Sequence, residues 1–259
     1  MEEVMASRSV DMYELRVPLD AVKRLSDENR FSYYLLGHIF NELMSLQKIV
    51  SFALPKHEDS RPARFRPENG QAMFMFRLAS GKIREASKAI RMNKQLASTL
   101  HNLILPRMVD GQNRLVKLNA AIDAASWLIP LRNGMVFHFP SFEDWEPHVK
   151  PDDSWVDDYV FLGEQSGNTF YDGADSVAQE WMFSQLGHPN LREAVDLLIG
   201  QLVELLTEMN TFLEDVLGTF IAEVMLDGKG MQKHVGKVLC TQFDQVSIPF
   251  WTVMKSRKD

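Results

Sequence analysis

The chain has 259 residues, of which 45% are hydrophobic and 24% are charged, and its net charge is −7. This balance excludes an intrinsically disordered chain and a uniformly basic surface that would bind any polyanion. The single cysteine, Cys240, excludes an internal disulfide framework and a zinc site with several cysteine ligands, and it suits a reducing compartment, so we expect a cytoplasmic protein.

The predicted elements up to residue 130 are mostly helices. Between about residues 25 and 53, apolar residues recur at helical spacing, while His38 and Glu42 share a different, polar face. Residues 55–70 are rich in proline and charge and predict a loop. Further helices are expected at about 71–92, 94–108 and 112–129, with a break between the last two at Asp110-Gly111.

The composition changes after Pro140. Residues 141–158 are acidic and aromatic and predict a surface loop, and residues 159–173 predict a short β-hairpin around a glycine-containing connection. A short helix is expected at 174–185. From Leu191 the apolar residues step alternately four and three positions, which predicts a long helix that packs into a bundle or a dimer and ends at Asp227-Gly228.

Together these elements predict an all-α protein. We expect a single helical domain over residues 1–259, with a small β-hairpin insertion and a long C-terminal helix. Within it, residues 20–140 would form the core bundle and 141–175 the loop and hairpin. Residues 176–228 would form the C-terminal helices, and the weakly patterned residues 229–259 a tail.

Several common classes of catalytic site have no signature in this chain. The chain has no HExxH metal motif, no GxxxxGK[ST] phosphate loop and no GxSxG nucleophile elbow. We therefore expect no metal and no cofactor. No apolar run approaches the roughly eighteen residues that a membrane-spanning helix requires, so no membrane partner is expected.

The segment LRNGMVFHFP, residues 131–140, is the one cluster with a catalytic composition. Arg132 and Asn133 are followed by His138 within an otherwise apolar segment that has a proline at each end. Two interpretations stay open from the residues alone. The segment is either core, with a buried His138 and an Arg132 that pairs with a carboxylate, or a site at which a histidine and a guanidinium act together.

An arginine with a polar neighbour and a histidine a few residues later resembles the motif of the higher-eukaryote and prokaryote nucleotide-binding (HEPN) superfamily. Here five residues separate Arg132 from His138, a series of predicted helices precedes them, and the VFHFP context and the downstream hairpin resemble a bacterial group near abortive-infection systems. The resemblance implies a helical bundle whose motif, with Arg132, Asn133 and His138 as catalytic residues, meets its copy across a homodimer axis. It further implies metal-independent RNA cleavage that leaves 2′,3′-cyclic phosphate ends, a role in phage defence or stress response, and an antitoxin as a possible partner.

The residue types suit this chemistry. A histidine can remove the ribose 2′-OH proton near neutral pH, and a guanidinium can stabilise the negative charge that develops on the phosphoryl oxygens. In a straight α-helix, however, six residues turn about 600°, so Arg132 and His138 would lie about 120° apart around the axis. We therefore predict that the helix breaks or restarts near Pro130.

Other residues are expected to support this site. Glu42 could approach the motif from the first long helix, although an ion pair of purely structural role is an alternative for it. RNA-binding residues are expected along one side of helix 71–92, where basic side chains form a stripe, or else a solvated face: Arg77, Arg84, Lys88 and Arg91. The alternative function is that of a non-catalytic helical module of the same fold that binds a partner or a nucleotide.

Overall fold

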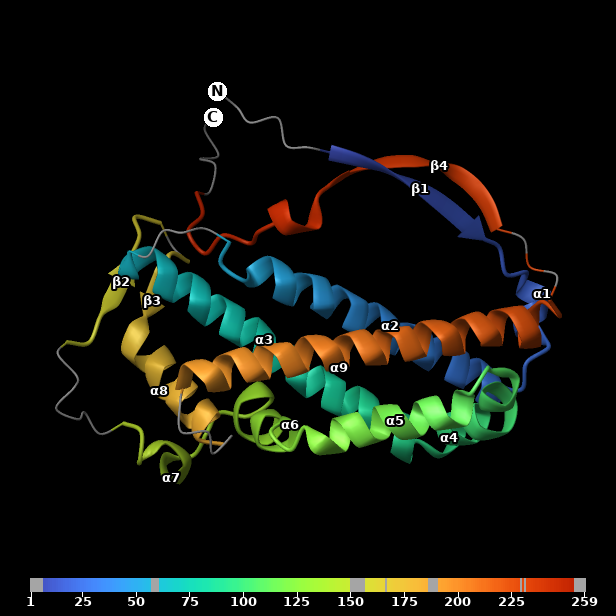
Figure 1. Ribbon diagram of the computed structural model, residues 1–259, viewed down its shortest axis with the longest axis horizontal. Coiled ribbons are helices and arrows are strands. Elements are labelled where there is room, and N and C mark those ends of the chain that lie inside the picture. Colours follow the sequence, from blue (N-terminus) through green and yellow to red (C-terminus); the bar gives the residue numbers. More distant parts are fainter. Residues whose placement is uncertain are drawn as a thin grey trace. The chain divides into compact units, whose positions relative to one another are not determined.

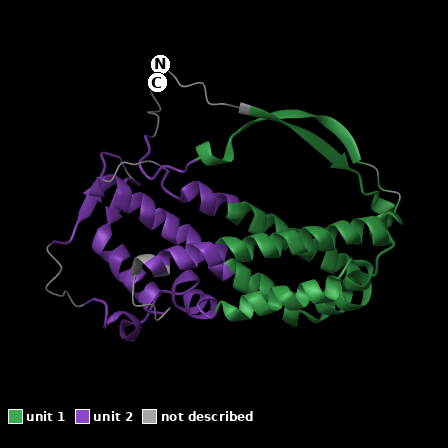
Figure 2. Ribbon diagram, in the orientation of Figure 1, with its two compact units in different colours: residues 1–47, 82–125, 203–246 green, residues 48–81, 126–202, 247–259 purple. Residues whose placement is uncertain are grey.

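The protein is mostly helical, as the sequence predicts, and the residues that the structure describes also form two small sheets (Figure 1). The computed structural model describes residues 7–56, 61–149, 157–165, 167–185, 191–228, 230 and 232–253. The chain forms two compact units, each made of three segments (Figure 2). Unit 1 comprises residues 1–47, 82–125 and 203–246, and unit 2 comprises residues 48–81, 126–202 and 247–259.

Three long helices contribute to both units: α2 (Asp27–Ala53), α3 (Pro62–Met92) and α9 (Leu191–Thr219). The predicted helix at 25–53 corresponds to α2, and the predicted long helix from Leu191 corresponds to α9. Both carry the apolar stripe that the sequence indicates, because the residues of that stripe are buried: Leu36, Ile39, Leu43, Leu46 and Val50 in α2, and Leu198, Leu202, Leu205, Met209, Phe212 and Val216 in α9.

Unit 1 adds short helices around its shares of α2, α3 and α9. These are α1 (Leu19–Lys23), α4 (Lys94–Thr99), the π-helix η1 (Leu100–Ile104), the 3-10 helix η2 (Leu105–Arg107) and α5 (Gly111–Ala124). The π-helix η4 (Phe220–Met225) continues α9, and the 3-10 helix η5 (Phe243–Gln245) lies near the end of the unit. The predicted break at Asp110 is confirmed, since this residue adopts a left-handed conformation with φ 56° ahead of α5.

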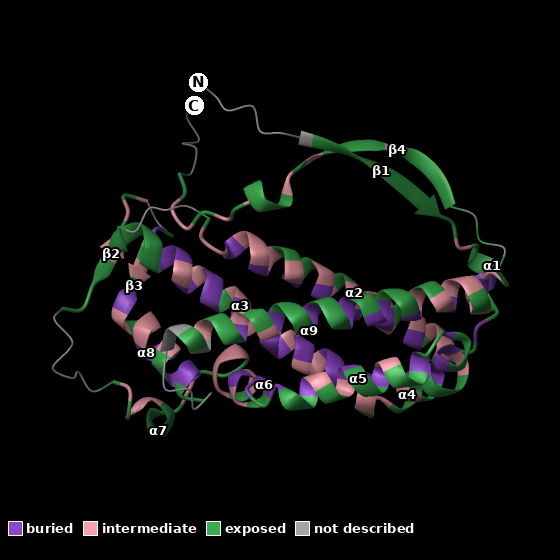
Figure 3. Cartoon of the chain, in the orientation of Figure 1, coloured by how far each residue is buried: buried purple, intermediate pink, exposed green. Residues whose placement is uncertain are grey.

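Unit 1 also holds a two-stranded antiparallel ribbon that the sequence did not predict. Strand β1 (Ser7–Leu15) pairs with β4 (Gln232–Thr241), and the register shifts once, between Met12 and Tyr13. Strand β4 lies within the segment 229–259 that was expected to be a weakly patterned tail; residues 254–259 of that segment lie outside the described residues. The prediction missed the ribbon because both of its faces are exposed, so neither strand has a clear alternation of apolar and polar residues (Figure 3).

Unit 2 contains the predicted hairpin. Strands β2 (Val160–Leu162) and β3 (Thr169–Tyr171) pair antiparallel within residues 159–173. The unit also contains α6 (Leu128–Leu131), the π-helix η3 (Arg132–Val136), the short helix α7 (Phe142–Trp145) and α8 (Asp172–Ser184), which agrees with the helix expected at 174–185. Its buried residues include two tryptophans and a stacked phenylalanine: Trp127, Trp181 and Phe76.

One segment of unit 2 corrects the sequence prediction. Residues 62–70 belong to α3 rather than to a loop, although Pro67 stands inside the helix. Proline has no N–H to donate to the carbonyl four residues earlier, which here is that of Ala63. The indole Nε1 of Trp251 donates to this Ala63 carbonyl at 3.0 Å instead. A side chain distant in sequence thus satisfies the acceptor that the proline leaves unpaired.

Candidate functional site

The motif segment follows a break in the helical chain. Helix α5 ends at Ala124, and Ala125 leaves helical geometry with φ −79° and ψ 66°. Helix α6 then begins at Leu128, so the predicted break near Pro130 lies a few residues before the proline. Pro130 falls in the first turn of α6, where its missing N–H would have had no helical partner.

Arg132 begins a π-helix rather than an α-helix. The hydrogen bonds of η3 (Arg132–Val136) span five residues instead of four, which widens the helix. The expected separation of about 120° between Arg132 and His138 assumed a straight α-helix. That assumption does not apply, because the backbone from Arg132 to Val136 is a π-helix and His138 lies beyond its end.

Local contacts fix the guanidinium of Arg132. Its Nη1 donates to the Oδ1 atom of Asn133 at 2.9 Å. Its Cζ atom lies 5.7 Å from the centroid of the Phe137 ring, a distance at which a cation is attracted to an aromatic face. Asn133 thus orients Arg132. Arg132 is half-buried.

The residues after η3 are exposed. His138 is exposed and makes no hydrogen bond with the part of the chain that the structure describes. Phe139 is 99% exposed and Phe137 is 44% exposed. The interpretation of His138, Phe137 and Phe139 as core is therefore wrong. The imidazole is accessible to a ligand instead.

Two glycines hold this segment close to its neighbours in unit 2. A Cβ atom at Gly134 would lie 2.3 Å from Cη2 of the buried Trp181 in α8, and one at Gly81 in α3 would lie 2.5 Å from Cγ1 of Val136. Any other residue at either position would push the segment away. The close packing places η3 directly against α3 and α8, so the backbone that carries Arg132 is supported on two sides.

Glu42, which was predicted to support the motif, lies in unit 1 and belongs to an ion pair there. Lys82 Nζ donates to both carboxylate oxygens of Glu42 at 3.0 Å, and His38 Nε2 lies 3.8 Å from Oε1 of the same carboxylate. These contacts agree with the alternative that Glu42 forms an ion pair of purely structural role.

The four basic residues predicted to hold RNA have different surroundings. Arg91 donates to the carboxylate of Asp123 at 2.7 Å and to the side chain and backbone of Asn119 at 2.8 Å, so it links α3 to α5. Arg77 is half-buried and near Asp175 of α8. Arg84 is half-buried and Lys88 is exposed. Arg77 and Arg91 therefore interact with other parts of the protein, and Lys88 is the most exposed cation of the four.

Arg77 and Asp175 are both half-buried in unit 2, and their charges interact. Burial lowers the pKa of Arg77, an effect that the nearby charge of Asp175 opposes, and its Nη1 atom is buried without a hydrogen-bond partner. Burial also raises the pKa of Asp175, although a hydrogen bond from Gln179 at 2.5 Å and the charge of Arg77 act in the opposite direction. The two charges are thus held in a poorly solvated environment.

This burial predicts an unusual pH dependence. The pKa of Asp175 is higher in the folded protein than in the unfolded chain, so the folded state binds the proton more tightly and its stability from this group increases as the pH falls. The wild type minus Asp175→Asn difference in the free energy of unfolding should therefore increase as the pH falls from 7 to 5. Urea denaturation of both proteins at the two pH values measures this difference in the free energy of unfolding. A difference that shrinks or stays constant contradicts the prediction.

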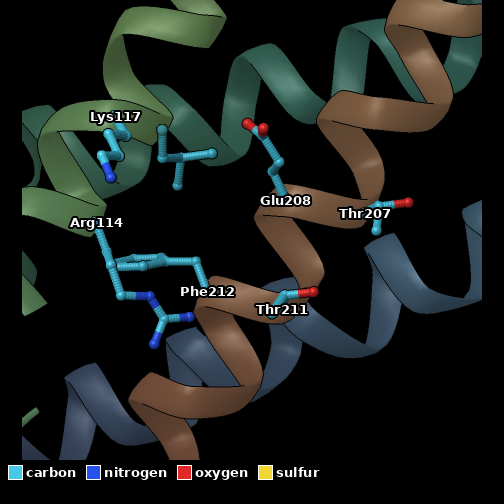
Figure 4. Close-up of a pocket in the computed structure, with 7 residues that line it drawn as sticks. Arg114, Lys117, Thr207, Glu208, Thr211 and Phe212 are labelled. Carbon is cyan, nitrogen blue, oxygen red and sulfur yellow. The ribbon is translucent and has the colours of Figure 1, made fainter. Parts of the chain in front are cut away.

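A pocket of about 270 Å³ lies in unit 1 between α5 and α9. Figure 4 shows basic residues of α5 on one wall and residues of α9 on the other, and Arg114 also forms an ion pair with Asp215 of α9. The sequence did not indicate this pocket, because its residues lie far apart in the chain. A weak signal is their helical spacing on two facing helices: Arg114, Lys117 and Leu118, and Thr207, Glu208, Thr211 and Phe212.

The described residues contain no cluster of three or more histidine, cysteine or acidic side chains that could hold a metal ion. In the same part of the chain, no helix is long and apolar enough to cross a membrane. Comparison of the sequence with protein-family models and with curated proteins, and of the fold with solved structures, found no match.

Proposed function

We propose that this protein is a HEPN-like, metal-independent endoribonuclease in which His138 and Arg132 carry the chemistry. The observation that supports the proposal is the contrast between the two side chains. His138 is exposed and without a hydrogen bond to the described residues, while the neighbouring Arg132 is fixed by Asn133 and Phe137. A purely structural motif would favour a buried histidine with its ring nitrogens satisfied.

The reaction is an internal transfer at phosphorus. The imidazole of His138 removes the proton of a ribose 2′-OH, and the 2′-oxygen attacks the adjacent phosphorus. The bond from phosphorus to the 5′-oxygen breaks, and this oxygen takes up a proton, which leaves a 2′,3′-cyclic phosphate and a 5′-hydroxyl end. Arg132 stabilises the negative charge on the phosphoryl oxygens through two parallel N–H donors.

The surroundings of His138 favour single-stranded RNA as the substrate. Phe137 and Phe139 flank the histidine and are both exposed. Exposed aromatic rings stack on unpaired bases, each stack contributing about 1–3 kcal/mol to binding. We further propose that the protein acts as a homodimer, so that the motif of a second copy supplies the acid that protonates the leaving oxygen. A role in phage defence or stress response follows from the resemblance alone.

The test is an RNA-cleavage assay with a matched histidine control. The wild-type protein is expected to cleave single-stranded RNA in the presence of EDTA and to leave 2′,3′-cyclic phosphate ends, which mass spectrometry identifies. His138→Ala should lower the rate by about 10²–10⁴-fold because it removes the general base. His148→Ala, a change outside the motif in the same unit, should cleave at the wild-type rate.

Three results would overturn the proposal: no cleavage by the wild type, cleavage lost in EDTA, or equal cleavage by wild type and His138→Ala. Binding of RNA without cleavage would instead support the alternative, a non-catalytic binding module.

A further inference from the structure

The β1–β4 ribbon of unit 1 is a two-stranded sheet with exposed apolar side chains. Val10 is 50% exposed, Met12 is 41% exposed and Leu239 is 74% exposed. A two-stranded sheet is marginally stable alone, and an unpaired strand edge is a template for another strand. The question is which edge is available, and what pairs with it.

The two edges differ in charge. Strand β4 carries Lys233, His234 and Lys237 and no acidic residue, and it is interrupted by the register shift and by Gly236 with φ 139°. Two copies of β4 would therefore place like charges side by side along an irregular edge. Strand β1 has no positive-φ residue and carries charges of both signs: Arg8, Asp11 and Glu14.

The charges of β1 are complementary to a second β1 in one antiparallel register. When two copies pair about Asp11, Arg8 of each lies opposite Glu14 of the other, and Val10 lies opposite Met12. Arg8 and Glu14 have no ion pair with the described residues of their own chain. Moving the centre to Val10 places Arg8 opposite Met12, and moving it to Met12 places Glu14 opposite Val10, so only the register about Asp11 pairs the charges.

This register also groups the apolar residues. Residues two apart in a strand point to the same face, so Val10 and Met12 of both copies share one face with Val238, the cross-strand partner of Val10. The two Asp11 carboxylates would meet on the opposite face. Each is already compensated in its own ribbon, because Oδ1 of Asp11 lies 2.9 Å from His234 Nε2 and 3.7 Å from Lys237 Nζ.

We propose that β1 is a self-association edge, on which a second copy of this chain pairs antiparallel about Asp11 to form a four-stranded sheet in the order β4-β1-β1-β4. The inference is independent of RNA cleavage. It rests on the exposed ribbon and on the matched charges of β1.

Charge reversal tests the register. Arg8→Glu and Glu14→Arg should each weaken the dimer by roughly tenfold or more in dissociation constant, because each places two pairs of like charges opposite one another. The double variant restores opposite charges and should recover most of the affinity. Lys23→Glu on exposed α1, which makes the same change in net charge as Arg8→Glu, should leave the dissociation constant unchanged. Analytical ultracentrifugation measures the association, and circular dichroism verifies folding.

Cross-linking gives a positive readout of the same register. In a Cys240→Ser background, Asp11→Cys should form an intermolecular disulfide, since directly opposed residues lie about 4.5–5.5 Å apart between Cα atoms. Ser9→Cys, two residues from the centre, should not, because its symmetry mate lies roughly 13 Å away. A monomeric wild type, a double variant no tighter than the single ones, or equal cross-linking at positions 9 and 11 overturns the proposal.

Discussion

Replacement of Arg132 by lysine is expected to slow RNA cleavage by about 10²-fold or more, although the positive charge is retained. Lysine is a single point charge on a flexible chain, whereas the guanidinium offers parallel donors that match two phosphoryl oxygens. Lysine also loses the planar group that stacks over the Phe137 ring and donates to Asn133, so the charge is no longer held in place. Cleavage rates with one RNA substrate at saturating concentration measure the effect.

The matched control is Arg107→Lys, the same change at an exposed arginine of unit 1 whose guanidinium donates to the Leu103 carbonyl. It should cleave at the wild-type rate. If Arg132→Lys is as active as the wild type while His138→Ala is inactive, the transition state needs a charge but no guanidinium, and the role assigned to Arg132 is incorrect.

The largest effect on stability is expected from Phe76→Ala. Phe76 is 2% exposed, and its ring stacks on that of Trp127 with 5.7 Å between centroids. Removal of a buried phenylalanine side chain typically lowers the free energy of unfolding by about 3–5 kcal/mol, through lost burial and the cavity left behind. Because Trp127 is the N-cap residue of α6, this loss is also expected to loosen the backbone leading to Arg132.

Phe74→Ala provides a control on the same helix, since Phe74 is 53% exposed. Its free energy of unfolding should stay within about 0.5 kcal/mol of the wild-type value. Urea denaturation followed by circular dichroism measures both variants. Equal losses for Phe74→Ala and Phe76→Ala would show that the Phe76–Trp127 stack does not stabilise unit 2 as its burial indicates.

Local patterns predicted the elements that bury one face. The apolar stripes of α2 and α9 could be identified from the sequence because burial of one face imposes a period on it. The hairpin β2–β3 could be identified because a glycine-containing connection lies between its two strands. Prediction from local patterns was wrong where an element buries neither face, or where a residue distant in sequence stabilises it. Strands β1 and β4 expose both faces. Helix α3 extends through Pro67 because the indole of Trp251 donates to the Ala63 carbonyl that the proline leaves unpaired.

For the candidate site, the sequence alone identifies the cluster, because Arg132, Asn133 and His138 are neighbours in the chain and have side chains suited to the proposed RNA cleavage. Their burial and support depend on the tertiary structure. It leaves His138 exposed and holds the intervening π-helix against Trp181 and Gly81. The composition of a segment sets its possible chemistry, whereas burial and orientation depend on contacts with residues far away in sequence, which no local pattern contains.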